Sequence, residues 1–101
     1  MTPINSLSAE EIISKIKNMT PWKINPMGRL EAEFKFQTFP DAFSFMTRIA
    51  FEAEQLDHHP DWSNSYNRVK IELTTHDAGG VTENDIKLAQ KITEIKARFL
   101  D

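Results

Sequence analysis

The chain of 101 residues contains no cysteine. This absence excludes disulfide bonds, catalysis by a thiolate, and zinc or iron–sulfur sites with cysteine ligands. Runs of apolar residues are short as well, as at residues 49–51, and none is long enough to cross a bilayer. Residues 1–5 lack the basic start and apolar stretch of a signal peptide, so we expect a cytoplasmic protein with no membrane partner.

Glycine is also scarce, and acidic residues outnumber basic ones. The net charge is −3, which argues against direct binding to nucleic acid. The chain has three glycines, and Gly79 and Gly80 do not have the spacing of a phosphate-binding loop. The content of 40% hydrophobic and 27% charged residues is typical of one domain over residues 1–101. A domain of this size buries roughly two-thirds of its extended surface, so self-association would add to a thin core.

Two helix starts are marked by capping boxes. Ser8 with Glu11 predicts the start of a short first helix, and Thr82 with Asp85 predicts the start of the last one. In a capping box the side chain of each partner bonds the backbone N–H of the other, which satisfies donors that a helix start leaves open. These two helices are therefore expected near the two ends of the chain.

A longer helix is expected from about residue 39 up to Pro60, which cannot continue it. Apolar side chains recur within it at helical spacing, and we expect them to face the core. These residues are Phe39, Phe43, Met46, Ile49, Ala50, Ala53 and Leu56.

Residues 30–36 and 68–74 alternate between apolar and polar side chains, as strands with one buried face do. Shorter strands are expected at residues 22–24 and near Trp62. The order helix, strand, strand, helix, strand, helix, with the extra strand near Trp62, predicts an α+β fold. One face of the sheet should carry the helices, and the other should meet solvent or a partner.

All three histidines lie in two short connections, with His58 and His59 after the long helix and His76 after the second long strand. Histidine titrates near neutral pH and can give or take a proton easily, and functional sites are often built at the ends of such elements. The histidines are therefore either candidates for acid–base catalysis or ordinary solvated loop residues.

Two carboxylates could orient these histidines. Glu54 precedes His58 by four residues and could contact its ring if the helix continues that far. Asp85 is expected chiefly to cap the last helix, with orientation of a histidine as the alternative. Asp57 is read as a solvated residue.

Other chemistries fit the sequence less well. Three histidines and a carboxylate match zinc or non-haem iron in ligand type, but adjacent histidines usually diverge and no familiar ligand spacing is present. No serine lies in a G-x-S-x-G elbow. Trp62 and Tyr66 could stack on a flat heterocycle or simply pack against the sheet. Acid–base chemistry without a metal is the favoured interpretation.

The histidine segments resemble the signature of the pterin-4a-carbinolamine dehydratase family. The resemblance covers residues 7–99, and no signature position departs from the family pattern. The residues that carry it are Glu54, His58, His59, Pro60, Tyr66, His76 and Asp85.

The resemblance implies a two-layer α+β fold, with a four-stranded antiparallel sheet and helices packed on one face. It also implies a homodimer or homotetramer formed through sheet edges and helices. The implied reaction is the loss of water from 4a-hydroxytetrahydropterin to give quinonoid dihydropterin, in the recycling of tetrahydropterins. Pterin is the substrate, and neither a metal nor an organic cofactor is implied.

The family also implies roles for individual residues. His58, His59 and His76 are the implied catalytic residues, with His58 and His76 as the acid–base pair and His59 in contact with the pterin and its C4a oxygen. Glu54 and Asp85 are implied to orient these groups. The residues implied to contact the substrate are His58, His59, Pro60, Thr75, His76, Asp77 and Ala78.

Two other functions remain open for the same chain. The site would equally serve a dehydratase-like protein of molybdopterin metabolism. Some relatives in the family are instead dimerisation cofactors of a transcription factor or assembly chaperones, which points to a non-enzymatic alternative. All three histidines are retained here, and this retention favours the enzyme.

Overall fold

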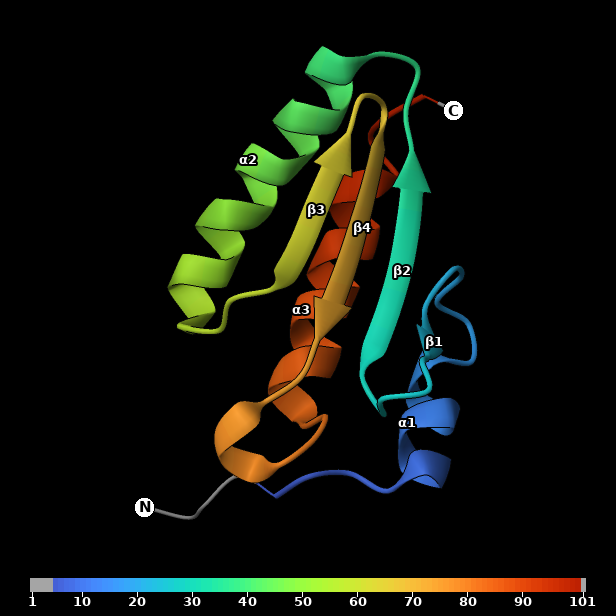
Figure 1. The fold of residues 1–101 in the computed structure, drawn as a ribbon, viewed down its shortest axis with the longest axis vertical. Coiled ribbons are helices and arrows are strands. Elements are labelled where there is room, and N and C mark those ends of the chain that lie inside the picture. The colour runs from blue at the N-terminus through green and yellow to red at the C-terminus, as the bar shows by residue number, and fades with distance from the viewer. Residues whose placement is uncertain (1–4, 101) are drawn as a thin grey trace.

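A computed structural model describes residues 5–100 of the chain, which fold into three α-helices, a short 3-10 helix and four strands (Figure 1). In chain order these elements are α1 (Ala9–Ile16), β1 (Lys23–Ile24), β2 (Leu30–Lys35), α2 (Phe39–Leu56), β3 (Asp61–Ser65), β4 (Arg68–Leu73), the 3-10 helix η1 (His76–Ala78) and α3 (Glu83–Lys96).

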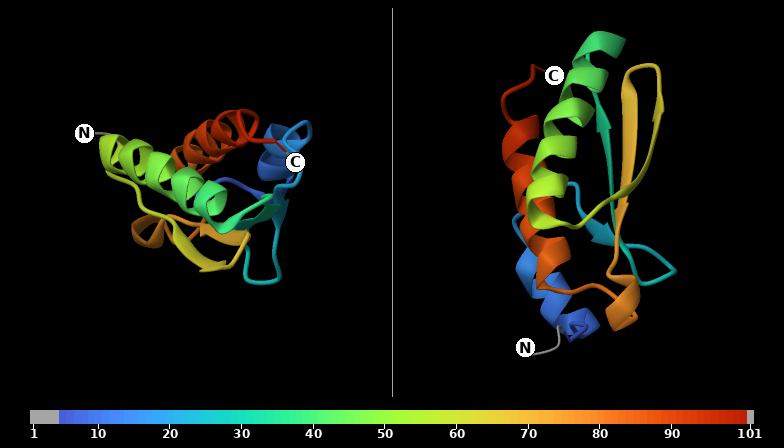
Figure 2. Two further views of the ribbon diagram at one scale, coloured as in Figure 1. Left: turned by 90° about the horizontal axis from the view of Figure 1, so that it is seen from above. Right: turned by 90° about the vertical axis from the view of Figure 1, so that its left-hand side faces the viewer.

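The four strands form one antiparallel sheet in the order β1-β2-β4-β3. The long helices α2 and α3 cover one face of this sheet, so that the domain has two layers (Figure 2). The α+β class, the four strands and the single helix-covered face are all confirmed. The short strands β1 and β3 also lie where the sequence predicted them.

Both expected capping boxes are present. The hydroxyl of Ser8 accepts the backbone N–H of Glu11 at 3.1 Å, and the Glu11 carboxylate accepts the N–H of Ser8 at 3.0 Å. At the start of α3, the carboxylate of Asp85 accepts the backbone N–H of Thr82 at 2.8 Å. Local sequence therefore determines where both helices begin.

Aromatic rings form the centre of the core between sheet and helices. Phe45 of α2 is fully buried, and its ring centroid lies 5.2 Å from that of Phe34 and 4.8 Å from that of Phe36. Phe99, just after α3, meets Phe36 and Phe45 edge-on. These contacts join α2 to β2, and join the residues after α3 to Phe36, which directly follows β2.

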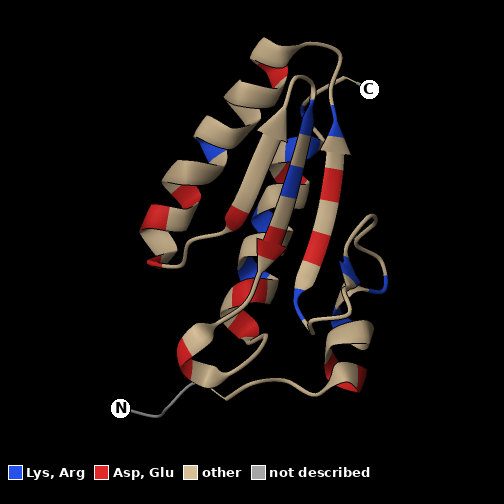
Figure 3. Cartoon of the chain, viewed as in Figure 1, with Lys and Arg blue, Asp and Glu red and all other residues tan. Residues whose placement is uncertain are grey.

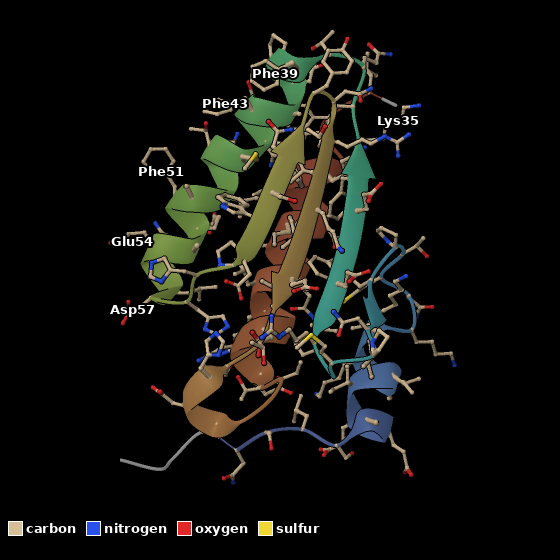
Figure 4. The ribbon with its side chains drawn as sticks, viewed as in Figure 1. Lys35, Phe39, Phe43, Phe51, Glu54 and Asp57 are labelled. Carbon is tan, nitrogen blue, oxygen red and sulfur yellow. The ribbon has the colours of Figure 1, made fainter. Side chains whose placement is uncertain are left out.

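The predicted inner face of α2 is partly wrong. Phe39 and Phe43 are exposed and line the outer side of the helix together with Phe51 (Figure 4), and Ala50 is exposed as well. Apolar residues lie on so many sides of this helix that the sequence contains two apolar stripes at helical spacing. Packing against the sheet determines which of the two is buried. The residues that are buried are Ala42, Phe45, Ile49 and Ala53.

Charged residues occupy the outer face of the sheet, where coloured bands alternate with tan bands, the buried positions, along β2 and β4 (Figure 3). Opposite charges face each other across the strands at Glu33 and Lys70. Arg68 donates to Glu33 at 3.1 Å. Between residues 5 and 100, no helix has the length and apolar character needed to span a membrane.

We expect Phe45→Ala to lower the free energy of unfolding by about 3–5 kcal/mol, because it removes a fully buried ring and leaves a cavity. Urea denaturation followed by circular dichroism measures this change. Ser44→Ala on the neighbouring exposed position is the control, with an expected change below about 0.5 kcal/mol. Equal effects of the two substitutions would contradict the assignment of the core.

Candidate active site

The end of α2 fixes the position of His58. Asp57 follows the helix in the left-handed conformation, with φ 50°, and its N–H donates to the carbonyl of Glu54 at 3.1 Å. The N–H of His58 donates to the carbonyl of Ala53 at 3.0 Å. This pair of bonds is a Schellman motif, which ends a helix and sets the direction of the next residues.

The helix therefore ends at Leu56, several residues before Pro60. The prediction that Pro60 stops the helix is wrong, because the left-handed Asp57 has already ended it. Glycine is the usual residue at this position of a Schellman motif, since a side chain makes the left-handed conformation unfavourable. Aspartate tolerates it better than most, and the Asp57 side chain lines the cavity described below.

The loop after β4 brings His76 to the same end of the sheet. Thr75 and Gly80 pair through two backbone hydrogen bonds, of 3.0 and 3.3 Å, and so close the loop at its base. Within the loop, His76 begins the 3-10 helix, and Gly79 turns the chain back with φ 74°. A side chain at Gly79 would be strained in this conformation.

Asp85 of α3 connects these two segments. Its carboxylate is completely buried, and one oxygen accepts both the N–H of Thr82 and the hydroxyl of Thr75, each at 2.8 Å. The other oxygen bonds Nε2 of His58. A buried carboxylate needs such partners, because removal from water is otherwise very unfavourable. Asp85 therefore both caps α3 and orients His58, so that both alternatives from the sequence hold.

Glu54 does not reach His58, because the helix ends too early. Its carboxylate instead accepts from Nε2 of His59 at 3.0 Å, and both side chains are largely exposed. Such a contact between exposed groups contributes little to stability. The expected pairing of Glu54 with His58 is thus wrong.

All three histidines line one open cavity of about 280 Å³. His58 is its buried member, with 11% of the side chain exposed, whereas His59 is 60% exposed. Figure 4 places Glu54 and Asp57 at the end of α2 beside this region. The other lining residues are Asp57, Thr74, Thr75 and Asp77.

The structure thus brings most of the expected site residues together. Pro60 and Ala78 do not line the cavity, although each adjoins a segment that does. Asp57 and Thr74 do line it, and sequence reasoning did not assign them to the site. For Thr74 a signal existed, since the apolar alternation of β4 ends there and two threonines lead directly to His76.

A larger cavity of about 880 Å³ lies at the other end of β2. It is lined in part by Phe34, Lys35 and Lys96 and contains no histidine or cysteine. It therefore lacks the residue type whose unperturbed pKa lies closest to neutral pH. The histidine cavity is therefore the better candidate for proton transfer, despite its smaller volume.

The arrangement of the histidine cavity suits acid–base chemistry. One imidazole is fixed by a buried carboxylate, and two more line the same cavity from two different segments. Proton donors and acceptors are thereby available on more than one side of a small ligand. Across residues 5–100, no three His, Asp or Glu side chains are grouped so as to hold a metal ion.

Comparison with known proteins identifies the family of this chain. Residues 5–95 match the family model described as pterin 4 alpha carbinolamine dehydratase. The chain belongs to this family.

Relatives from several bacteria agree. A protein of Christiangramia forsetii named "Putative pterin-4-alpha-carbinolamine dehydratase" is 49% identical over 91% of this chain and 94% of its own length. One of the same name from Prochlorococcus marinus is 46% identical over 91% of this chain and 96% of its own.

Solved structures have the same fold. The crystal structure of a "transcriptional coactivator/pterin dehydratase" from Brucella melitensis has a TM-score of 0.86 and 42% identity, over 90% of this chain and 98% of that one. A "pterin dehydratase-like protein" described as a RuBisCO assembly factor in the alpha-carboxysome shares the fold, with a TM-score of 0.63 and 20% identity over 73% of this chain and 87% of its own.

We expect Asp85→Asn to keep the cap of α3 but to change the tautomer of His58. The amide oxygen can still accept from Thr82 and Thr75, whereas its NH₂ group then faces Nε2 of His58. Because the NH₂ group is a donor, Nε2 must be unprotonated to accept from it, and the ring then carries its proton on Nδ1. Long-range ¹H–¹⁵N NMR of the histidine rings detects this change. Urea denaturation should show that the free energy of unfolding falls by about 1 kcal/mol, because the negative charge at the start of α3 is removed.

The matched control is Glu54→Gln, which alters the exposed contact to His59. It should leave the His58 resonances unchanged and the free energy of unfolding within about 0.5 kcal/mol. An unchanged His58 tautomer in Asp85→Asn would contradict the proposed orientation of the ring.

Proposed function

We propose that the protein is a 4a-hydroxytetrahydropterin dehydratase, which releases quinonoid dihydropterin and water in the recycling of tetrahydropterins in the cytoplasm. The observation that carries this proposal is the cavity lined by all three histidines, with His58 bonded to the buried Asp85. Membership of the pterin 4 alpha carbinolamine dehydratase family supports it.

The reaction needs two proton movements. The bond between C4a and its hydroxyl oxygen breaks, and that oxygen takes a proton and leaves as water. N5 loses its proton, and the electron pair left on nitrogen forms the new C4a–N5 double bond. A donor and an acceptor that titrate near neutral pH can serve both steps, each with an effect of roughly 10²–10⁴-fold on rate.

We assign these two steps to His58 and His76, which lie on separate segments around the cavity. The exposed His59 would contact the pterin and its C4a oxygen. Asp85 would hold the ring of His58 in one orientation, and Glu54 would do the same for His59 at 3.0 Å. The chemistry needs no metal or organic cofactor.

The remaining wall positions the flat ring. Thr75 and Asp77 line the cavity opposite the end of α2, and Ala78 completes the 3-10 turn that carries them. Pro60 restricts the backbone of the histidine segment, because proline limits the conformation of the residue before it. Both segments are thus preorganised for a rigid substrate.

The test is stopped-flow absorbance with freshly generated 4a-hydroxytetrahydropterin. The wild type should accelerate dehydration, and His76→Ala should lose about 10²-fold or more of that acceleration, because one proton-transfer group is gone. His76 is exposed in a loop, so circular dichroism and the melting temperature should stay unchanged.

Gln90→Ala, an exposed substitution on α3, is the control and should retain full activity. A folded wild type that gives no acceleration would contradict the dehydratase. Full activity in His76→Ala would still support the dehydratase reaction but would show that His76 takes no part in it.

We further propose that the chain forms a homodimer or homotetramer, in part through the outer face of α2. Phe43 and Phe51 are 56% and 70% exposed there, and Phe39 packs against Phe43. Exposed aromatic side chains gathered on one face are typical of protein interfaces. The alternative is that a different protein binds this surface. The description of the Brucella relative as a "transcriptional coactivator/pterin dehydratase" supports that alternative.

Sedimentation equilibrium tests this proposal. The wild type should sediment as an oligomer, and Phe43→Lys with Phe51→Lys should weaken association by more than about tenfold, because aromatic anchors carry much of the binding energy at interfaces. Gln90→Lys adds charge to the exposed side of α3 and should leave association unchanged. A monomeric wild type at all concentrations would contradict self-association.

A further inference from the structure

A second cavity, of about 310 Å³, adjoins the histidine cavity, and Thr74 and His76 line both. Its other walls are residues 27–29, in the turn between β1 and β2, and the glycines Gly79 and Gly80. Binding sites for small molecules usually have at least roughly 300 Å³. The histidine cavity alone lies just below that size, so a bicyclic ligand with a substituent needs the space beside it.

The turn that forms this wall is held rigidly by Asn25, which is almost completely buried. The side-chain oxygen of Asn25 accepts the backbone N–H groups of Met27 and Arg29, both at 3.0 Å. Its backbone N–H donates to the carbonyl of Arg29, and its carbonyl accepts from Gly28, both at 2.9 Å. Gly28 has φ 78°, where glycine is favoured, so sequence and hydrogen bonds fix one conformation.

Arg29 is the cationic residue of this wall. Its Nη1 donates to the carboxylate of Glu72 at 3.2 Å, and Asn25 donates to the second oxygen of Glu72 at 2.9 Å. Asn25 also bonds Glu31, and this hydrogen bond holds the pKa of Glu31 below its usual value. The guanidinium carries five N–H donors, and its contact with Glu72 uses one of them.

The pairing with Glu72 decides which ligand chemistry suits Arg29. The carboxylate already balances the positive charge, which disfavours a second anion relative to a neutral group with oxygen acceptors. Hydrogen bonds from a charged donor to hydroxyl oxygens remain favourable. The second cavity therefore suits a hydroxylated, uncharged group.

The chemistry of pterins places such a group next to the reacting atoms. C4a and N5 react, and C6, which carries the variable substituent of pterins, is bonded directly to N5. If the reacting atoms lie against His76, the C6 substituent leaves the ring beside His76. The second cavity lies there.

We infer that the second cavity binds the C6 substituent of the pterin and that Arg29 determines specificity for a hydroxylated one. The inference rests on the proposed dehydratase function. In it, Arg29 contacts the substituent and takes no part in proton transfer.

The experiment compares two substrates, the 4a-hydroxytetrahydropterins with a 6-methyl and with a 6-dihydroxypropyl group, in stopped-flow assays of the full chain. Arg29→Gln should raise KM for the dihydroxypropyl substrate by about tenfold and leave its kcat unchanged, because a charged hydrogen-bond donor is lost. Both constants for the 6-methyl substrate should stay as in the wild type. Arg29→Lys keeps a charge beside Glu72 and should restore part of the loss.

Arg68→Gln is the matched control, because it also removes an arginine–glutamate pair from the outer face of the sheet but lies outside both cavities. It should change neither substrate's constants. Equal KM increases for both substrates, or none in Arg29→Gln, would overturn the inference while the dehydratase function stands. A wild type inactive on both substrates would overturn the proposed function itself, and the inference with it.

Discussion

The buried carboxylate of Asp85 is the constraint on which the histidine site depends. A charge with no exposed surface must be surrounded by donors, and here the donors come from three separate segments: the start of α3, Thr75 after β4, and His58 after α2. If any one of these segments moved away, the buried carboxylate would lose one of its hydrogen bonds. The segments of the site lie beyond the ends of the strands, so hydrogen bonds to this carboxylate, and not the hydrogen bonds of the sheet, hold them together.

This arrangement couples stability to chemistry. The same oxygen that caps α3 also fixes the Thr75 side chain, which leads into the loop of His76. The other oxygen orients His58. In contrast, His59 and Glu54 form an exposed pair with little structural consequence. The histidines thus differ in environment, from the nearly buried His58 bonded to Asp85 to the largely exposed His59 bonded to Glu54.

Much of the fold could be predicted because its signals are local. The capping boxes at Ser8 and Thr82 and the alternation along β2 and β4 involve residues a few positions apart. The contact between His58 and Asp85 joins residues 27 apart, and spacing alone could not show it. The sequence also could not show which side of α2 is buried. Packing against the sheet buries the side with Ala42 and Phe45 and leaves the side with Phe39 exposed. The prediction that the three histidines form one site came from the family resemblance and not from the periodicity of the sequence.

Asp57 belongs both to the end of α2 and to the wall of the histidine cavity. A sequence optimised only for folding would place glycine in the left-handed residue that ends α2. An aspartate that lines the cavity stands there instead, directly before His58. Strained positions of this kind concentrate at functional sites. Glycine in place of Asp57 would relieve the backbone and remove a carboxyl group from the cavity wall in one step, so the stability of this helix end and the composition of the cavity cannot be changed separately here.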